Sequence, residues 1–189
     1  VAVAKHLSVA VDDLRFEGEL HAAFLRAPHA HARIEAVETT EAMAMPGVSG
    51  VFTAEDLARD AVRDIPAMFL PADKRGQKPF APAQPVLARG HVRHVGEAVA
   101  MVVAESAAQA LDAAERIAVR FTPLPAAVDT ETAEAADTPA AWPDAPGNLC
   151  YVHEIGDAAA TDAAFAGAAH IVARRIVNNR LIIHSIEPR

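Results

Sequence analysis

The chain has 189 residues, 52% of them hydrophobic, and a formal net charge of −8 at pH 7. This length suits one domain, or one domain with part of a second, and the apolar content excludes the disordered and fibrous classes. The negative charge and the 5% aromatic content disfavour nucleic-acid binding, which needs phosphate neutralisation or stacking on bases. No apolar run approaches the ~20 residues that span a bilayer, and no signal-peptide pattern opens the chain.

The first third of the chain predicts strands alternating with short helices. The predicted elements are a strand at 18–26, a strand at 32–38, a short helix capped by Thr39 or Thr40, and a strand at 48–52. The first two strands show the two-residue alternation of a half-buried sheet. Thr53, with Asp56 three residues later, has the form of a capping box and predicts the start of another helix.

Residues 59–85 change character. Prolines at 66, 71, 79, 82 and 85, with Gly76, exclude long regular structure there. So long a connection in a compact domain is usually functional, covered by a partner or mobile. We therefore interpret 64–85 as a candidate contact with the rest of the protein or with a partner subunit, and an exposed mobile loop is the alternative. The densest basic group, Lys74, Arg75 and Lys78, fits a solvated loop.

Regular structure returns after residue 92. Residues 97–104 are almost wholly apolar and predict a strand that is buried on both faces. Ser106 and Gln109 form a second predicted capping box, and apolar residues then recur at helical spacing to Ile117. A strand at 118–122 follows. A strand, a helix and a strand in this order predict a crossover unit with parallel strands.

The last third begins with a predicted linker, rich in Ala, Pro, Asp and Thr, at about 126–148. It is followed by a predicted strand at 151–155, a helix that Gly156-Asp157 opens and Gly167 ends, and a strand at 170–176 whose only later partner is 181–183. A segment of this size buries too little surface to be stable alone, so we expect it to open a larger domain. The first residue, Val1 rather than Met, fits the same expectation.

Three histidines suggest a metal site, although a structural role fits them better. His29 and His31 are two residues apart and would share a face of a strand, with His21 nearby. A structural zinc site usually has four ligands, often including cysteine, so a packing role at a turn is the stronger interpretation. The single cysteine, Cys150, excludes an intrachain disulfide and predicts a buried structural thiol in a reducing cytoplasm.

Other candidate chemistry is equally weak. Asp12 and Asp13, with Glu17, could act in acid–base catalysis, but adjacent residues of a strand point to opposite faces, so turn capping or a salt link fits better. Gly96 stands alone and is no phosphate-binding loop. We therefore predict no catalytic, no cofactor-binding and no metal-binding residue in this chain.

Blocks of sequence along the whole chain nevertheless carry a resemblance. They include Val11-Asp-Asp-Leu14, Arg26-Ala-Pro-His-Ala-His-Ala-Arg-Ile34, Gln84-Pro-Val-Leu-Ala88, Phe121-Thr-Pro-Leu-Pro125 and Glu187-Pro-Arg189. In order and spacing they resemble the opening of molybdenum hydroxylase large subunits, the family of xanthine dehydrogenase, aldehyde oxidase and CO dehydrogenase. The chain departs from the family at His6 and Ala10, where Gly and Tyr are usual. It also departs at Leu181, where xanthine-dehydrogenase-like members carry a glutamine, so no residue that contacts molybdenum is carried over.

The resemblance implies an α+β fold. It places an α/β-hammerhead domain over 1–128, a linker over 129–148, and the opening strand–helix–strand segment of the molybdopterin-binding domain over 149–189. The complete enzyme would hydroxylate an aldehyde or an N-heterocycle, or oxidise CO, with a molybdopterin-type molybdenum cofactor.

The resemblance also implies partners. These are the remainder of the large subunit and the iron–sulfur and FAD-binding subunits or domains, and they include neither nucleic acid nor membrane. The chain itself would be a structural part that is not catalytic alone and holds no cofactor. A free-standing split-gene assembly or binding module is the alternative.

Overall fold

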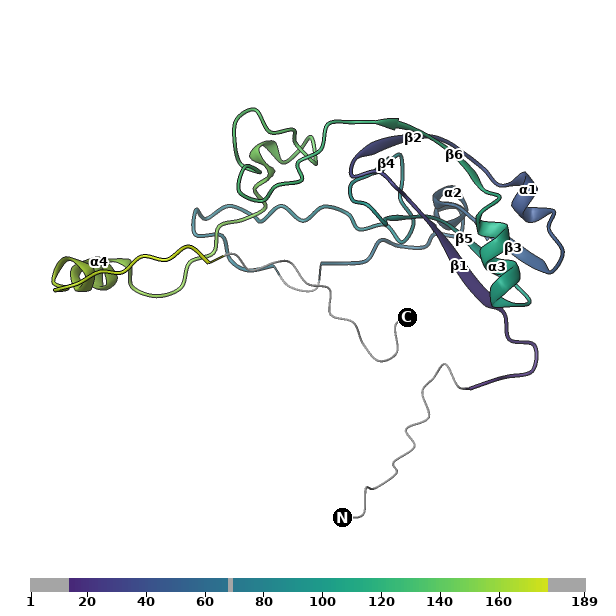
Figure 1. Cartoon of the computed structure of the whole chain (residues 1–189), viewed down its shortest axis with the longest axis horizontal. Coiled ribbons are helices and arrows are strands. Elements are labelled where there is room, and N and C mark those ends of the chain that lie inside the picture. Colours follow the sequence, from purple (N-terminus) through teal and green to yellow (C-terminus); the bar gives the residue numbers. More distant parts are fainter. Residues whose placement is uncertain (1–13, 68–69, 177–189) are drawn as a thin grey trace, which may run out of the picture. The chain divides into compact units, whose positions relative to one another are not determined.

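The computed structural model describes residues 14–67 and 70–176, and the chain divides into two compact units. The larger unit is Gly18–His153, and the smaller one combines Val1–Glu17 with Glu154–Arg189. The larger unit holds two antiparallel sheets with short helices, and the smaller unit holds helix α4 (Figure 1). This is the mixed α and β architecture that the sequence predicts.

The first sheet has three strands in the order β1-β5-β3. Its members are β1 (His21–Arg26), β5 (Ala98–Ala104) and β3 (Val48–Phe52). Both pairings are antiparallel, and the central strand β5 is flanked on each side. Helix α3 (Ala107–Ala114) and helix α1 (Thr40–Met43) contact this sheet (Figure 1).

The second sheet has the order β4-β2-β6 and is also antiparallel. Its strands are β4 (His91–Val92), β2 (Ala32–Glu38) and β6 (Ala118–Pro123). Helix α2 (Ala54–Arg59) follows β3, and the short 3-10 helix η2 (Pro146–Asn148) lies late in the unit.

Alanines dominate the core between the first sheet and α3. Ala110 and Ala113 of α3 are fully buried, as are Ala100 and Val102 of β5. Such small side chains let the helix approach the sheet closely, and close-packed interiors tolerate few voids. A second cluster gathers around Val92 and Val99 and includes Ala27, Ala32 and Ala88.

The predicted capping box of Thr53 and Asp56 is confirmed, and Ser106 is confirmed as the N-cap of α3 without the reciprocal backbone bond of a capping box. The backbone N–H and the hydroxyl of Thr53 donate to the Asp56 carboxylate at 2.8 and 2.7 Å. The Ser106 hydroxyl accepts from the Gln109 N–H at 3.3 Å and donates to the side-chain oxygen of Gln109 at 2.7 Å. These contacts satisfy N–H groups that the first turn of a helix otherwise leaves without partners.

The predicted parallel crossover of 97–104, the helix and 118–122 is wrong. Strand β5 already has β1 on one edge and β3 on the other, so no edge is left for β6. Strand β6 instead pairs antiparallel with β2 in the second sheet. The handedness rule for crossovers applies only when both strands belong to one sheet.

The helix predicted for the last third of the chain is confirmed, whereas its flanking strands are not. Helix α4 (Ala158–Ala166) begins after Asp157, whose side chain accepts from the Ala160 N–H at 2.9 Å, and ends at Gly167. The predicted strands at 151–155 and 170–176 are wrong, since neither segment forms a strand in the described structure. An extended segment needs a neighbouring strand for its backbone groups. The predicted partner at 181–183 lies outside the described residues.

Candidate functional site

The histidines that suggested a metal site make separate contacts. The His29 ring meets Phe121 of β6 edge-to-face, with ring centroids 5.0 Å apart. The Nδ1 atom of His31 lies 2.9 Å from the Pro125 carbonyl oxygen, and the His21 ring lies near Glu19. Across residues 14–67 and 70–176, no three His, Cys, Asp or Glu side chains gather in a way that could hold a metal. His29 and His31 therefore tie the β1–β2 turn to the end of β6.

The other suggested groups are placed only in part. Asp12 and Asp13 lie outside the described residues, and Glu17 is exposed. Gly96 adopts a positive φ of 86° and donates its N–H to the Ala27 carbonyl at 2.8 Å. It is a turn residue, because a positive φ favours glycine.

The most organised polar group of the larger unit centres on Asp73. Its side chain is fully buried, and it is the buried charged residue of the described core. The carboxylate accepts from the Arg75 N–H at 2.8 Å and from the Arg75 guanidinium. It also accepts from the Val152 N–H at 3.2 Å. The Arg75 guanidinium therefore holds the pKa of this carboxyl well below its usual range.

Further backbone contacts join the residues around Asp73 to the residues around Val152. The Lys74 N–H donates to the Val152 carbonyl at 2.8 Å, and the Phe80 N–H donates to the Cys150 carbonyl at 2.9 Å. The His153 ring lies 3.3 Å from the Ala72 carbonyl. We call the contacts between residues 72–80 and 150–153 the Asp73 clamp. The clamp joins the proline-rich segment to residues about 75 positions later in the chain.

The single tryptophan lies beside the clamp. The Arg93 guanidinium stacks over the Trp142 ring at 3.5 Å from its centroid, and Arg93 Nε donates to the Ala141 carbonyl at 3.1 Å. The Phe80 ring meets Trp142 edge-to-face at 6.3 Å. Burial lowers the pKa of Arg93, which remains a cation at neutral pH, so the cation–π contact persists. Trp142 thus holds residues 141–142 against both Arg93, just after β4, and the proline-rich segment.

The Asn148 side chain joins three parts of the predicted linker by hydrogen bonds. Its amide Nδ2 donates to the carbonyls of Ala133 and Pro139 at 2.9 and 3.0 Å, and its Oδ1 accepts from the Ala141 N–H at 2.8 Å. Asn148 has a positive φ of 54°, a conformation that asparagine tolerates better than most residues. The segment predicted as a linker is therefore folded on itself.

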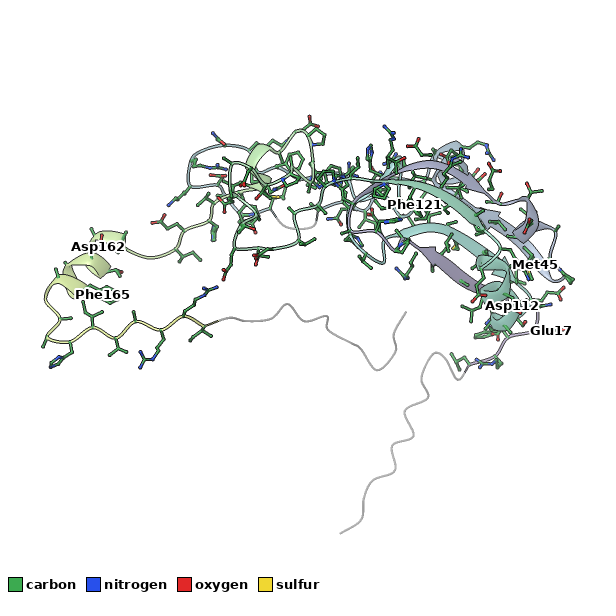
Figure 2. All side chains as sticks on the ribbon, turned by 45° about the horizontal axis from the view of Figure 1, so that its top comes forward. Glu17, Met45, Asp112, Phe121, Asp162 and Phe165 are labelled. Atoms are coloured by element: carbon green, nitrogen blue, oxygen red, sulfur yellow. The ribbon has the colours of Figure 1, made fainter. Side chains whose placement is uncertain are left out.

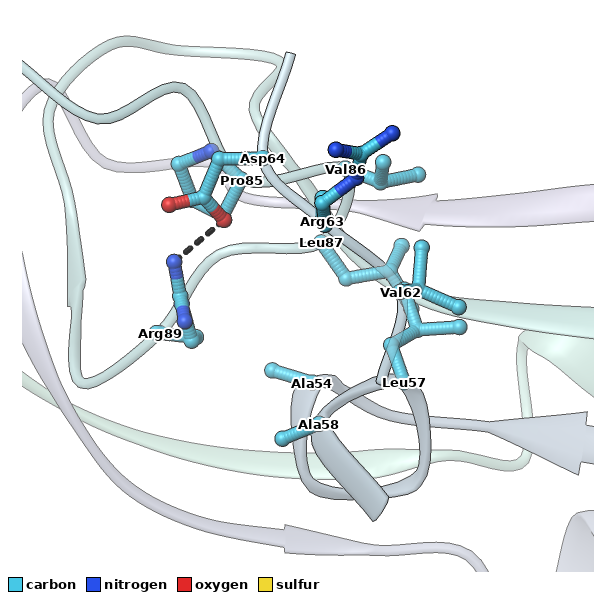
Figure 3. A pocket seen from close by; sticks show the side chains of 10 residues that line it. All are labelled: Ala54, Leu57, Ala58, Val62, Arg63, Asp64, Pro85, Val86, Leu87 and Arg89. Atoms are coloured by element: carbon cyan, nitrogen blue, oxygen red, sulfur yellow. Dashed lines mark hydrogen bonds and ion pairs between the residues drawn. The ribbon is translucent and has the colours of Figure 1, made fainter. Parts of the chain in front are cut away.

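The proline-rich segment is closed at its base. The Asp64 carboxylate forms an ion pair with Arg89, and the Ile65 N–H donates to the Gln84 carbonyl at 2.8 Å. Figure 3 shows the ion pair at the rim of a small hollow of about 20 Å³. Leu87, only 2% exposed, lines this hollow together with Leu57 and Val62. The proline-rich segment, residues 64–85, is therefore a long loop whose two ends are held together.

A wider hollow of about 580 Å³ opens beside the clamp, between residues 75–81 and 144–150. Its lining residues are Arg75, Gln77, Lys78, Pro79, Phe80, Ala81, Asp144, Ala145, Leu149 and Cys150. In the described part of the chain, every buried side-chain nitrogen or oxygen has a hydrogen-bond partner.

Cys150 corrects another prediction. The thiol was predicted to be buried at the edge of a strand, but Cys150 is exposed, outside any strand, at the wider hollow. The backbone of residue 150 is used by the clamp, which turns the side chain toward solvent. The prediction failed because it assumed a strand that residues 151–155 do not form.

We expect Cys150 to react with Ellman's reagent in the native chain, in a 1:1 ratio and without denaturant, because an exposed thiol is open to attack. The measurement is the absorbance released in buffer and in concentrated urea. A Cys150→Ser variant is the control and should release none. Reaction that needs urea would show that the thiol is buried.

Sequence reasoning missed the residues that organise this region. Asp73, Arg93, Trp142 and Asn148 were not singled out, although the carboxylate and guanidinium of Asp73 and Arg75 are two residues apart. A lone tryptophan in a polar linker was a second available signal. The contacts that define the region span up to 81 residues, so local patterns could not reveal them.

Comparisons with known proteins give a consistent result. Residues 8–125 match the family model described as aldehyde oxidase and xanthine dehydrogenase, a/b hammerhead domain. The carbon monoxide dehydrogenase large chain of Afipia carboxidovorans is 35% identical over 84% of this chain and 20% of its own length. The nicotine 6-hydroxylase large subunit of Paenarthrobacter nicotinovorans is 32% identical over 95% of this chain and 21% of its own length.

A solved structure agrees with these relatives. Reconstituted CO dehydrogenase from Oligotropha carboxidovorans has 35% identity and a TM-score of 0.69, covering 84% of this chain and 20% of that one. The chain therefore spans about a fifth of the length of the relatives it matches. None of the helices in the described ranges has the length and apolarity that a bilayer crossing demands.

Proposed function

This chain belongs to the aldehyde oxidase and xanthine dehydrogenase family through its α/β-hammerhead domain, and we propose that it is the N-terminal structural part of a molybdenum hydroxylase large subunit. Its described contacts are those of a scaffold. Helices and sheets pack through small apolar side chains, and the buried carboxylate Asp73 joins segments of chain rather than facing a substrate.

The proposal includes the domain boundaries. We propose a hammerhead domain over 1–128, a linker over 129–148, and the start of the molybdopterin-binding domain at 149. The end of the family match at residue 125 supports the first boundary. The Asp73 clamp, which lies within the larger unit Gly18–His153, would then hold the first residues after this boundary, 150–153, against the proline-rich segment. This contact is the observation that carries the proposed scaffold role.

In the complete enzyme we propose hydroxylation of a small substrate at carbon, or oxidation of CO. Hydroxylation inserts oxygen from water and releases two electrons and two protons. A molybdopterin-type cofactor would supply this chemistry, and iron–sulfur and FAD-binding subunits or domains would accept the electrons. Relatives named as molybdenum-binding subunits and as part of a dehydrogenase complex support the cofactor and the partners. A cytoplasmic location belongs to the same proposal.

Metal analysis tests the proposed role. The purified 189-residue chain should contain neither molybdenum nor zinc above trace, and it should lack the absorbance of a bound pterin. The control is the complete large subunit that carries this sequence, expressed with its partner subunits, which should contain molybdenum and oxidise a substrate. Stoichiometric molybdenum in the short chain would contradict a purely structural role. A stable complex of the short chain with a separately encoded cofactor subunit would favour the split-gene alternative.

A further inference from the structure

Strand β5 is apolar on both of its faces. Ala100, Val102 and Ala104 are fully buried, and they pack in the core that includes α3. The alternate residues Met101 and Val103 point to the opposite face and are only partly buried. The sequence predicts that this strand is covered on both sides, and the described chain covers the second side only in part. Val99 is 1% exposed there, whereas Met101 and Val103 keep part of their surface open.

The neighbouring strands continue this second face. Phe24 of β1 and Phe52 of β3 both pair directly with Met101. Ala22 and Gly50 pair in the same way with Val103. Side chains of directly opposed residues lie on the same face of a sheet. We call this surface the outer face, and its residues are Ala22, Phe24, Gly50, Phe52, Met101 and Val103. Ala22 and Phe24 are exposed, Phe52, Met101 and Val103 are partly buried, and Gly50 is buried next to the Phe52 ring.

The composition of the outer face is unusual for a surface in water. An antiparallel sheet with one solvated face normally alternates apolar and polar residues, and the solvated side carries the polar ones. None of the six residues is polar or charged, and Phe24 is 42% exposed. Leu20, just before β1, is 52% exposed and continues the same alternation. Apolar surface of this kind marks an interaction site.

We propose that the outer face is a permanent interface covered by the part of the large subunit that this chain does not contain. The inference rests on the proposed function. The relatives are about five times longer than the stretch they share with this chain, so most of such a subunit remains to be packed against it. Interfaces without charged residues are typical of obligate contacts, whereas transient partners use more polar surfaces.

Hydroxyl-radical footprinting tests this interface. The labelling rates of Phe24 and Met101 are measured by mass spectrometry in the 189-residue chain, in the complete large subunit alone and in the assembled enzyme. Leu111 on α3 and Met43 on α1, which are 61% and 48% exposed, are the controls. We expect labelling of Phe24 and Met101 to fall on the order of tenfold in the large subunit alone, as in a close-packed interface. The rates at Leu111 and Met43 should change little.

Other results would overturn the proposal. Protection that arises only in the assembled enzyme would assign the outer face to a partner subunit. Protection that rises with the concentration of the short chain would assign it to a second copy. Unchanged labelling, or equal protection of the controls, would remove the interface. The molybdenum content of the same large-subunit preparation tests the proposed function separately, because it does not depend on what covers Phe24.

Discussion

Replacement of Leu87 with alanine is expected to lower the free energy of unfolding of the larger unit by about 3 kcal/mol. Leu87 is 2% exposed and is among the largest fully buried side chains described. Around it lie Leu57 and Val62, beside a hollow of only about 20 Å³, so little neighbouring space is free (Figure 3). The truncation therefore removes buried apolar area and leaves a cavity. Urea unfolding followed by circular dichroism and by Trp142 fluorescence measures the change.

The neighbouring residue provides a matched control. Val86 is 42% exposed, and its replacement with alanine should change the free energy of unfolding by less than about 0.5 kcal/mol. The two variants differ by one position in the chain and remove similar side chains. Equal effects would show that the end of the proline-rich segment does not pack as described.

Replacement of Asp73 with asparagine is expected to open the Asp73 clamp. Asparagine keeps the shape of the side chain but loses the charge that the Arg75 guanidinium pairs with, which leaves that cation without its partner. Amide hydrogen exchange at residues 72–80 and 150–153, measured by mass spectrometry, should accelerate on the order of tenfold or more, as for a local opening. Exchange in α3 should be unchanged.

An exposed carboxylate is the control for this variant. Asp112 lies on the exposed side of α3 (Figure 2), and its replacement with asparagine should leave exchange in the clamp unaltered. The pH dependence adds a second check. Because the pKa of Asp73 is lowered in the folded chain, its stabilisation is complete above the unfolded pKa of about 3.9. It is lost as the pH falls through the folded value. Wild-type protection that declined between pH 7 and 5 would contradict the ion pair.

Much of the larger unit could be predicted from the sequence because its signals are local. Thr53 and Ser106 cap α2 and α3 through hydrogen bonds to residues three positions later. In β1 and β2 the alternation of apolar and polar residues indicates which face is buried. Helix α4 was predicted from Asp157 and Gly167 for the same reason. The α/β-hammerhead assignment came from the resemblance of several blocks, and the family match confirms it.

The features that escaped prediction depend on partners far away in the chain. Whether β6 pairs with β5 or with β2 depends on which of these strands has a free edge. The sequence of β6 itself does not indicate this. Segment 151–155 has the composition of a strand, but its backbone at Val152 is taken by Asp73 and Lys74. The exposure of Cys150 follows from the same contact.

The pairing of the strands also bears on how the chain is made. Strand β1 ends at Arg26, but its partner β5 does not begin until Ala98, and β2 pairs mainly with β6 after residue 117. During synthesis at about 5–20 residues per second, β1 to β3 therefore leave the ribosome several seconds before they can pair. Topologies with such distant contacts fold slowly. Strand β5 is the central strand, so both β1 and β3 can pair as soon as β5 has left the ribosome. Release of the nascent chain before Ala104 would therefore leave unpaired strand edges open to aggregation.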